Sequence, residues 1–245
     1  MKMKNIIVSI VMIFTMFSLS NAKEILVAIS PIRPPFMYID EKGEIAGYDP
    51  EIARTILKKL GHTVKFVNME FSGLIPSLTT GKVDLVVSGL TINDERKKVI
   101  DFSENYNETG SRVFVMEGDK YKSLKDLKGK KVGAELGTVQ ADYVNENAEK
   151  YGYEVVIFNA ANEMFLDLVK KGGGVDAIVE NQTLAQEYAK KQKVKIKSIS
   201  DLVKPSKFGI GIAKGNEKFL KEINDVLKEM KKSGEQKKIH KKYFK

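Results

Sequence analysis

The sequence predicts an α/β protein made of two similar halves. Short apolar segments typical of strands alternate with amphipathic segments typical of helices along the chain from Glu24 onward. In each half, a strand is followed by a polar turn containing Gly, Ser or Thr, and then by the start of a helix. Because such alternation is typical of sheets covered by helices, we expect mainly parallel sheets.

The first half contains a well-marked helix that starts at Asp49. Pro50 stands at its first full position, where the missing N–H is tolerated, and Gly61 ends it. A glycine-bearing loop at residues 40–43 predicts a hairpin. We expect strands at residues 25–29, 36–39, 45–48, 64–67 and 84–88, and helices at 49–60, 72–80 and 93–99.

The second half follows the same alternation from residue 112. We expect strands at residues 112–115, 131–134, 155–158, 175–179 and 208–213, and helices at 139–151, 164–170 and 219–232. The lysines between residues 190 and 197 are interpreted as a solvated face, and those from residue 237 onward as the decoration of a C-terminal tail.

The composition excludes several kinds of chemistry. The 245 residues include no cysteine and only two histidines, which rules out disulfides, thiolate metal sites and a cysteine nucleophile. We therefore expect no metal site and no cofactor. The formal net charge is +9, but the lysines are spread over many elements and the tyrosines form no stacking platform among them. No nucleic-acid partner is expected.

The N-terminus has the parts of a secretory signal peptide. Lys2 and Lys4 supply positive charge, residues 6–17 are apolar, and small residues lead up to Ala22. We expect residues 1–22 to be a signal peptide cleaved after Ala22. The alternative, a membrane anchor, is disfavoured because the apolar run is shorter than the roughly 20 residues of a membrane span. With no cysteine for lipid attachment, we expect free diffusion in the periplasm.

The turn at residues 88–91 is the most informative candidate site. It leaves the C-terminal end of a buried strand, where α/β sheets bind ligands. The hydroxyls of Ser88 and Thr91, together with backbone N–H groups and the following helix N-terminus, suit an anionic group. Arg96 is near enough to fold back and grip a carboxylate with its planar fork. The alternative is that Thr91 or Asn93 only caps the helix and that Arg96 is a surface charge.

Ordered motifs along nearly the whole chain carry a family resemblance. They lie at residues 34–36, 47–49, 73–78, 81–84, 88–92, 94–96, 101–103, 122–133 and 136–138. Together they closely resemble the polar amino-acid-binding proteins of bacterial ABC importers, which are two-lobed periplasmic binding proteins of type II. The resemblance implies one lobe at residues 23–108 and 206–245 and another at 109–205, joined by two hinge crossings near 106–111 and 203–208.

The resemblance also implies a binding site between the lobes. Arg96 is expected to hold the α-carboxylate of an amino acid. Thr91 and the backbone at Gly89 would assist from the first lobe. Thr138 and the Val139 amide would assist from the second. The complete set of expected substrate-binding residues is Ser30, Arg33, Phe71, Ser88, Gly89, Thr91, Arg96, Glu135, Thr138, Val139, Glu180 and Asn181.

One position departs from the family pattern. Five residues after Asp176, where the family usually has an aspartate that holds the ligand ammonium, this chain has Asn181. An asparagine accepts a hydrogen bond but adds no charge. Either Glu180 takes over this role or ammonium binding is weaker. Ser88 and Gly89 would also offer groups to the ammonium.

Three residues bear on the side chain of the ligand. Phe71 is expected to pack against it, and Arg33 stands where the family commonly has Tyr or Phe. A free Glu135 would favour a cationic ligand, whereas a free Arg33 would favour an acidic one. If the two pair across the cleft, a neutral polar ligand fits best. The alternative for each is an exposed charge at the rim of the cleft.

The expected function is that of a monomeric receptor for a free amino acid. Contacts from both lobes would favour the closed form, which would dock on an inner-membrane ABC permease. No catalysis is expected. The alternative is a periplasmic dehydratase of the cyclohexadienyl dehydratase type on the same scaffold, with Glu135 or Glu180 as its general acid.

Overall fold

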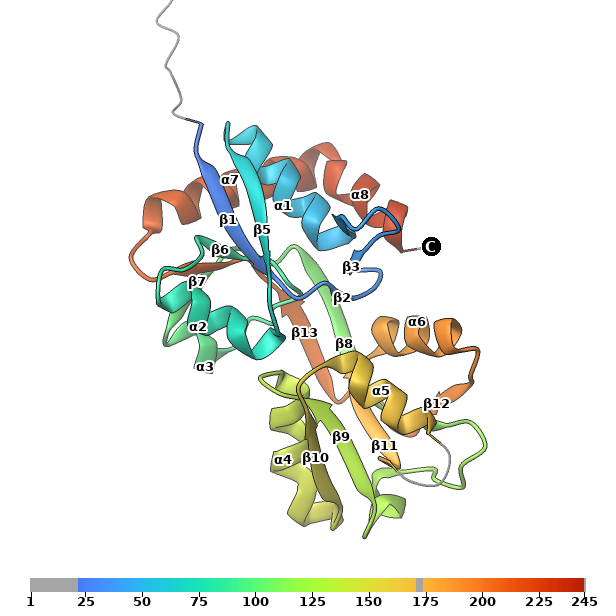
Figure 1. Cartoon of the computed structure of the whole chain (residues 1–245). Coiled ribbons are helices and arrows are strands. Elements are labelled where there is room, and N and C mark those ends of the chain that lie inside the picture. Colours follow the sequence, from blue (N-terminus) through green and yellow to red (C-terminus); the bar gives the residue numbers. More distant parts are fainter. Residues whose placement is uncertain (1–21, 171–173, 245) are drawn as a thin grey trace, which may run out of the picture.

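A computed structural model describes residues 22–170 and 174–244. The chain forms two α/β lobes, one above the other in Figure 1, connected by the strands β8 (Asn107–Met116) and β13 (Lys204–Phe208). Of the predicted signal peptide, residues 1–21 lie outside the described part. Within the described part, no helix has both the length and the apolar character needed to cross a membrane.

The first lobe is built on a mixed sheet in the order β5-β1-β6-β14-β7. The strands are β1 (Glu24–Ile29), β5 (Thr63–Asn68), β6 (Leu85–Val86), β7 (Ile100–Phe102) and β14 (Gly211–Ala213). A small antiparallel sheet follows β1 in the chain and consists of β2 (Ile32–Arg33), β3 (Met37–Ile39) and β4 (Ile45–Ala46). The helices are α1 (Tyr48–Lys59), α2 (Leu74–Thr79), α3 (Asp94–Lys97), α7 (Glu217–Ser233) and α8 (Glu235–Tyr243).

The second lobe has a sheet in the order β10-β9-β11-β8-β12, with β13 also paired to β8. Its other strands are β9 (Lys131–Glu135), β10 (Glu154–Phe158), β11 (Ala177–Asn181) and β12 (Ile196–Ser198). The helices are α4 (Val139–Tyr151), α5 (Ala161–Val169) and α6 (Gln182–Gln192). Figure 1 shows these helices around the lower sheet.

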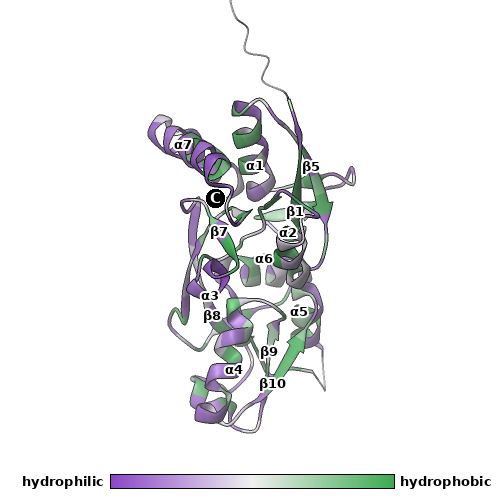
Figure 2. Cartoon of the chain, turned by 90° about the vertical axis from the view of Figure 1, so that its left-hand side faces the viewer, coloured by the Kyte–Doolittle hydropathy of each residue, from purple (hydrophilic) through white to green (hydrophobic). Residues whose placement is uncertain are grey.

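Each sheet buries apolar side chains on both faces. Along β1, Val27 and Ala28 belong to different apolar clusters, because successive strand residues point to opposite faces. In the second lobe, Ile178 and Val179 of β11 divide in the same way. In Figure 2, β5 and β10 show broad green areas, whereas α4 and α7 show much purple.

The two connecting segments lie side by side. β8 and β13 form an antiparallel ladder that runs from the pair Ser111–Lys204 to the pair Asn107–Phe208. The segments 106–111 and 203–208, in which crossings were predicted, therefore fall within one two-stranded ribbon between the lobes (Figure 1).

One prediction about the strands is confirmed and another was wrong. Both large sheets are mixed, but in each only one of the described strands runs against the others, β14 in one sheet and β8 in the other, so the sheets are mainly parallel as expected. The predicted strand 208–213 is two strands in different sheets. Phe208 pairs with β8 and Gly211 with β6, and Gly209 lies at the change of sheet, where a Cβ would come within 2.8 Å of the Ile92 side chain.

The lysine-rich stretches contain helices that the sequence did not predict. α6 covers part of residues 190–197, and α8 occupies most of the predicted tail. In α8, Ile239 is buried and the Lys242 ammonium contacts the Glu51 carboxylate of α1 at 2.5 Å. A helix that buries so little apolar surface leaves a weak periodic signal in its sequence.

Replacing Gly47 by alanine tests how tightly the hairpin meets α1. Gly47 has a φ of 121°, and a Cβ there would lie 2.4 Å from the Phe36 carbonyl oxygen. We expect Gly47→Ala to lower the free energy of unfolding by about 3 kcal/mol or more, since backbone strain and a clash add up. The matched control is Gly43→Ala, at a φ of 81° with no heavy atom within 4 Å. It should cost only about 1–2 kcal/mol. Equal losses in urea unfolding would contradict the predicted clash.

Candidate functional site

Four strands end where the two lobes meet. Ser30 follows β1 and Ser88 lies two residues beyond β6 in the first lobe. Glu135 is the last residue of β9 and Asn181 the last of β11 in the second lobe. The strands β1 and β6 are parallel neighbours, as are β9 and β11, so each pair brings its polar ends together.

Polar contacts join the lobes at this level. The Arg96 guanidinium of the first lobe donates to the Gly137 carbonyl oxygen of the second, at 2.9 Å. Arg33 forms an ion pair with Glu135, and the Tyr188 hydroxyl donates to the Ile32 carbonyl oxygen. The structure therefore brings the predicted residues of the two lobes together.

Arg96 lies in the short helix α3 and is buried. Asn93 caps this helix by accepting a hydrogen bond from the Arg96 backbone N–H at 2.8 Å, as the alternative interpretation expected. The Arg96 side chain, however, is only 8% exposed, so it is not a surface charge. It donates to the Thr91 carbonyl oxygen at 2.7 Å, and no carboxylate lies within salt-bridge distance in the described residues. Burial lowers the pKa of Arg96 to about 10.

Arg33, Glu135 and Glu180 form a buried charge cluster beside Phe71. The Arg33 guanidinium lies over the Phe71 ring, 4.8 Å from its centroid. It contacts the Glu135 carboxylate and lies 3.7 Å from that of Glu180. Because Arg33 and Glu135 are 8% and 1% exposed, neither is a rim charge. Of the arrangements left open by the sequence, the pairing of Arg33 with Glu135 across the cleft is the one observed.

The N-terminus of α4 faces the same region. Thr138 caps the helix: its hydroxyl accepts from the Ala141 N–H at 3.2 Å and donates to the Glu135 carbonyl oxygen at 2.6 Å. The hydroxyl is thus occupied, whereas the Val139 amide belongs to the first turn, whose N–H groups have no partner within a helix. A cavity of about 270 Å³ lies between the lobes nearby. Thr91 and Val139 line it together with four acidic residues, Asp94, Glu95, Asp142 and Glu146, and Arg96 is not among its lining residues.

Asn181 is already engaged in local structure. Its side-chain oxygen caps α6 by accepting from the Thr183 and Leu184 N–H groups, and its amide donates to the Thr109 hydroxyl at 2.7 Å. The neighbouring Glu180 is 2% exposed, and one oxygen accepts from the Asn181 N–H. Burial raises the pKa of Glu180, while Arg33 and that N–H oppose the rise.

Two of the predicted groups at residues 88–91 are hydrogen-bonded within the first lobe. The Ser88 hydroxyl accepts from the Ser30 N–H at 3.0 Å, and the Gly89 N–H donates to Asp49 at 2.5 Å. Asp49 was missed from the sequence as part of the site. Its place in the motif 47–49, one of those that carry the family resemblance, was the available signal, but it was interpreted only as the start of a helix.

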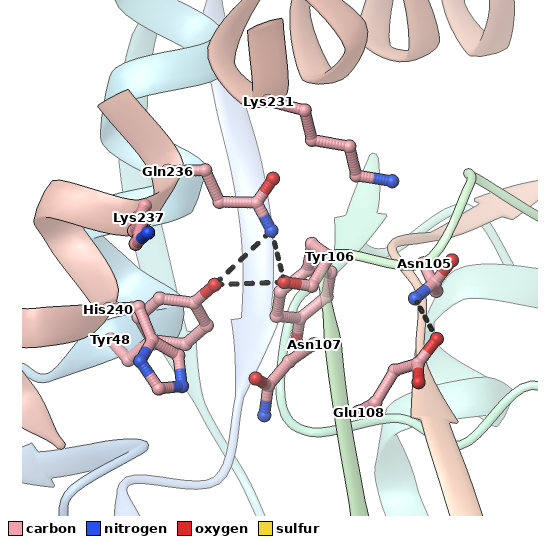
Figure 3. A pocket seen from close by; sticks show the side chains of 9 residues that line it. All are labelled: Tyr48, Asn105, Tyr106, Asn107, Glu108, Lys231, Gln236, Lys237 and His240. Carbon is pink, nitrogen blue, oxygen red and sulfur yellow. Dashed lines mark hydrogen bonds between the residues drawn. The ribbon is translucent and has the colours of Figure 1, made fainter. Parts of the chain in front are cut away.

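A larger cavity lies elsewhere, at the N-terminal end of β8 (Figure 3). Its volume is about 370 Å³, and none of the predicted substrate-binding residues lines it. Here the Tyr48 hydroxyl and the Gln236 amide both donate to the Tyr106 carbonyl oxygen, at 2.8 and 2.5 Å. These bonds tie α1 and α8 to the start of the connecting strand. Across the described residues, no group of three or more His, Cys, Asp or Glu side chains is arranged to hold a metal ion.

Comparison with known proteins identifies the family. The model of the bacterial extracellular solute-binding proteins, family 3, matches residues 25–245. The chain belongs to this family. Among relatives of this solute-binding protein, the L-cystine-binding protein TcyJ of Escherichia coli (strain K12) is 32% identical over 231 residues, covering 92% of this chain and 85% of the relative.

Solved structures agree with the observed fold. An ancestral arginine-binding protein bound to arginine superposes with a TM-score of 0.85 at 41% identity, covering 91% of this chain and 98% of the other. The ancestral amino acid-binding protein AncCDT-1, described as a precursor of cyclohexadienyl dehydratase, gives a TM-score of 0.80 at 35% identity, over 91% and 95% of the two chains. The predicted two-lobed α/β architecture of type II is confirmed for this solute-binding protein.

Asp49 is a buried carboxyl group that contacts the turn at residues 88–91. One of its oxygens accepts from the Gly89 N–H and, at 2.8 Å, from the Tyr106 hydroxyl. Burial raises the pKa of Asp49 to about 7, although both hydrogen bonds oppose the rise. Asp49 thus connects the turn at Gly89 with the start of β8 through a group that titrates near neutral pH.

We expect Asp49 to make the stability of the protein depend on pH. Its folded pKa of about 7 exceeds its ordinary value of 3.8, so the folded state binds the proton more tightly. The contribution to the free energy of unfolding is therefore full below pH 4 and is lost as pH rises through 7, on the order of 4 kcal/mol in all. Asp49→Asn removes this titration. Urea unfolding from pH 4.5 to 8 should show the wild type losing stability relative to the variant, and parallel curves would disprove the raised pKa.

Proposed function

We propose that this chain is the solute-binding component of an ABC importer, which closes its two lobes around a free amino acid and delivers it to an inner-membrane permease. The observation that carries the proposal is the buried guanidinium of Arg96. It is buried between the lobes and bonded to two backbone carbonyl oxygens, with no carboxylate partner in the described residues. Burying an unpaired charge is costly, and the α-carboxylate of an amino acid would supply the partner.

The second lobe would complete the carboxylate site. We assign this role to the first turn of α4, where the Val139 amide and the positive end of a 13-residue helix favour an anion. Thr138 would act by shaping this helix start, because its hydroxyl is already used in the cap. Thr91 of the first lobe and Val139 of the second line the same cavity. Closure would thus bring groups from both lobes onto one carboxylate.

We assign the ammonium group of the ligand to Glu180 rather than Asn181. The Asn181 oxygen already accepts two hydrogen bonds from the start of α6. Glu180 offers a buried carboxylate beside Arg33. An ammonium placed there would offset the desolvation that raises the pKa of Glu180. Ser30, Ser88 and Gly89 would support this arrangement through the backbone of the turn.

The other parts of the proposal concern the cell and the movement of the lobes. We propose cleavage after Ala22, release to the periplasm and action as a monomer without enzymatic activity. The lobes would comprise residues 23–108 with 206–245, and 109–205, and would move about the β8–β13 ribbon. The relatives are named as binding proteins of transport systems or as amino acid-binding proteins, which supports a receptor over a dehydratase.

Truncating Arg96 tests the carboxylate assignment. A thermal-shift screen over the common amino acids and cystine first selects a ligand, because a ligand bound only by the native state raises the melting temperature. For that amino acid, we expect Arg96→Ala to weaken binding about 100-fold or more in calorimetry. Arg96→Lys should weaken it less, because the charge remains while the planar fork is lost.

Arg54 provides the matched control. It is an exposed arginine of the same lobe that lies over the Phe66 ring, 4.8 Å from the centroid. Arg54→Ala should leave amino-acid affinity unchanged. Unchanged affinity in a folded Arg96→Ala variant would overturn the carboxylate assignment, and a screen without any amino-acid ligand would overturn the proposed function.

A further inference from the structure

The charge cluster places a protein arginine inside the binding region. Arg33 ends β2, and its guanidinium lies over the Phe71 ring at a distance suited to a cation–π contact. On its other side it meets two carboxylates, those of Glu135 and Glu180, from neighbouring strands of the second lobe. An aromatic ring on one side and carboxylates on the other are the surroundings that a cationic ligand side chain needs.

The charges of the cluster determine which net charge the side chain of a ligand can carry. Arg33 carries one positive charge, and Glu135 and Glu180 carry two negative charges between them. Under the proposed function, the ligand ammonium pairs with Glu180. The Arg33–Glu135 pair that remains is electrically neutral. A second charge on the ligand side chain would then be buried without a partner, whichever its sign.

The pair still has hydrogen-bonding capacity. Nε of Arg33 and Oε1 of Glu135 make no hydrogen bond within the described residues, whereas Nη2 of Arg33 and Oε2 of Glu135 face each other in the ion pair. Arg33 therefore keeps an unused donor and Glu135 an unused acceptor. A complementary group has to accept and donate side by side while carrying no net charge.

We propose that Arg33 takes the place of a cationic ligand side chain, so that this protein rejects arginine and lysine and selects a neutral amino acid with a side chain that both accepts and donates. The inference rests on the proposed function and extends it to the class of ligand. Two sources have this chemistry: a carboxamide, as in glutamine, and a second amino-acid head, as in cystine. In either, a carboxylate or carbonyl oxygen faces Arg33 and an N–H group faces Glu135.

The selectivity of the wild-type protein is the first test. Calorimetry with glutamine, asparagine, cystine, arginine, lysine, glutamate and aspartate should show binding of glutamine or cystine at least about 30-fold tighter than any of the four charged amino acids. Glutamine and cystine as separate arms show which source fits. The chain has no cysteine, so cystine cannot exchange with a protein thiol.

Removing Arg33 should reverse the selectivity. Arg33→Ala leaves Glu135 and Phe71 open to a cation, so arginine affinity should rise about 30-fold or more while glutamine and cystine affinity falls. In the double variant Arg33→Ala/Glu135→Gln, the gain for arginine should disappear because its partner is gone. Arg54→Ala is the control for loss of an arginine outside the cluster. Thermal unfolding reports whether each variant is folded.

The outcomes separate this inference from the proposed function. Arginine, lysine, glutamate or aspartate binding to the wild type as tightly as glutamine and cystine would overturn the inference and leave the receptor function in place. A folded Arg33→Ala variant without any gain for arginine would also overturn it. If no amino acid binds to any variant, both fall. Should Arg33→Ala not fold, the wild-type selectivity decides alone.

Discussion

The need to pair buried charges governs the region between the lobes. Two arginines and two glutamates lie there almost out of contact with water. Arg33 has the carboxylates of Glu135 and Glu180 beside it, whereas Arg96 donates to two carbonyl oxygens and forms no ion pair within the described residues. Charges removed from water are tolerated only with partners, and the two arginines differ in this respect. Arg33 belongs to an ion pair of the protein, whereas under the proposed function the carboxylate of the bound amino acid is the partner of Arg96.

The fold places these charges by joining two similar sheets through one ribbon. Because β13 pairs with the first half of β8, from Asn107 to Ser111, both connections between the lobes run in one two-stranded ribbon. The start of β8 is secured by Tyr106, which is bonded through its hydroxyl to Asp49 and through its carbonyl oxygen to Tyr48 and Gln236. The turn at residues 88–91, α1 and α8 are thus all connected to the start of β8.

Much of this arrangement was predictable from the sequence, and the exceptions have physical reasons. The elements with strong periodicity and caps, such as α4, agree with their predicted bounds. The burial of Arg96 followed from the turn before it and from the family motifs. The engagement of Asn181 did not, because capping depends on the backbone angles at a helix start. Asp49 was missed because its partners Gly89 and Tyr106 lie 40 and 57 residues away in the sequence.

The position of β14 determines which of the two sheets can be completed first during synthesis. This strand lies between β6 and β7 in the first sheet, yet it begins only at Gly211. The second lobe draws its strands, β8 to β13, from one continuous stretch that ends at Phe208. Pairing across a long stretch of chain is slow because the loop must close first. During synthesis, the lobe that contains the beginning of the chain is therefore the last to gain its full sheet, after the other lobe has all of its own strands.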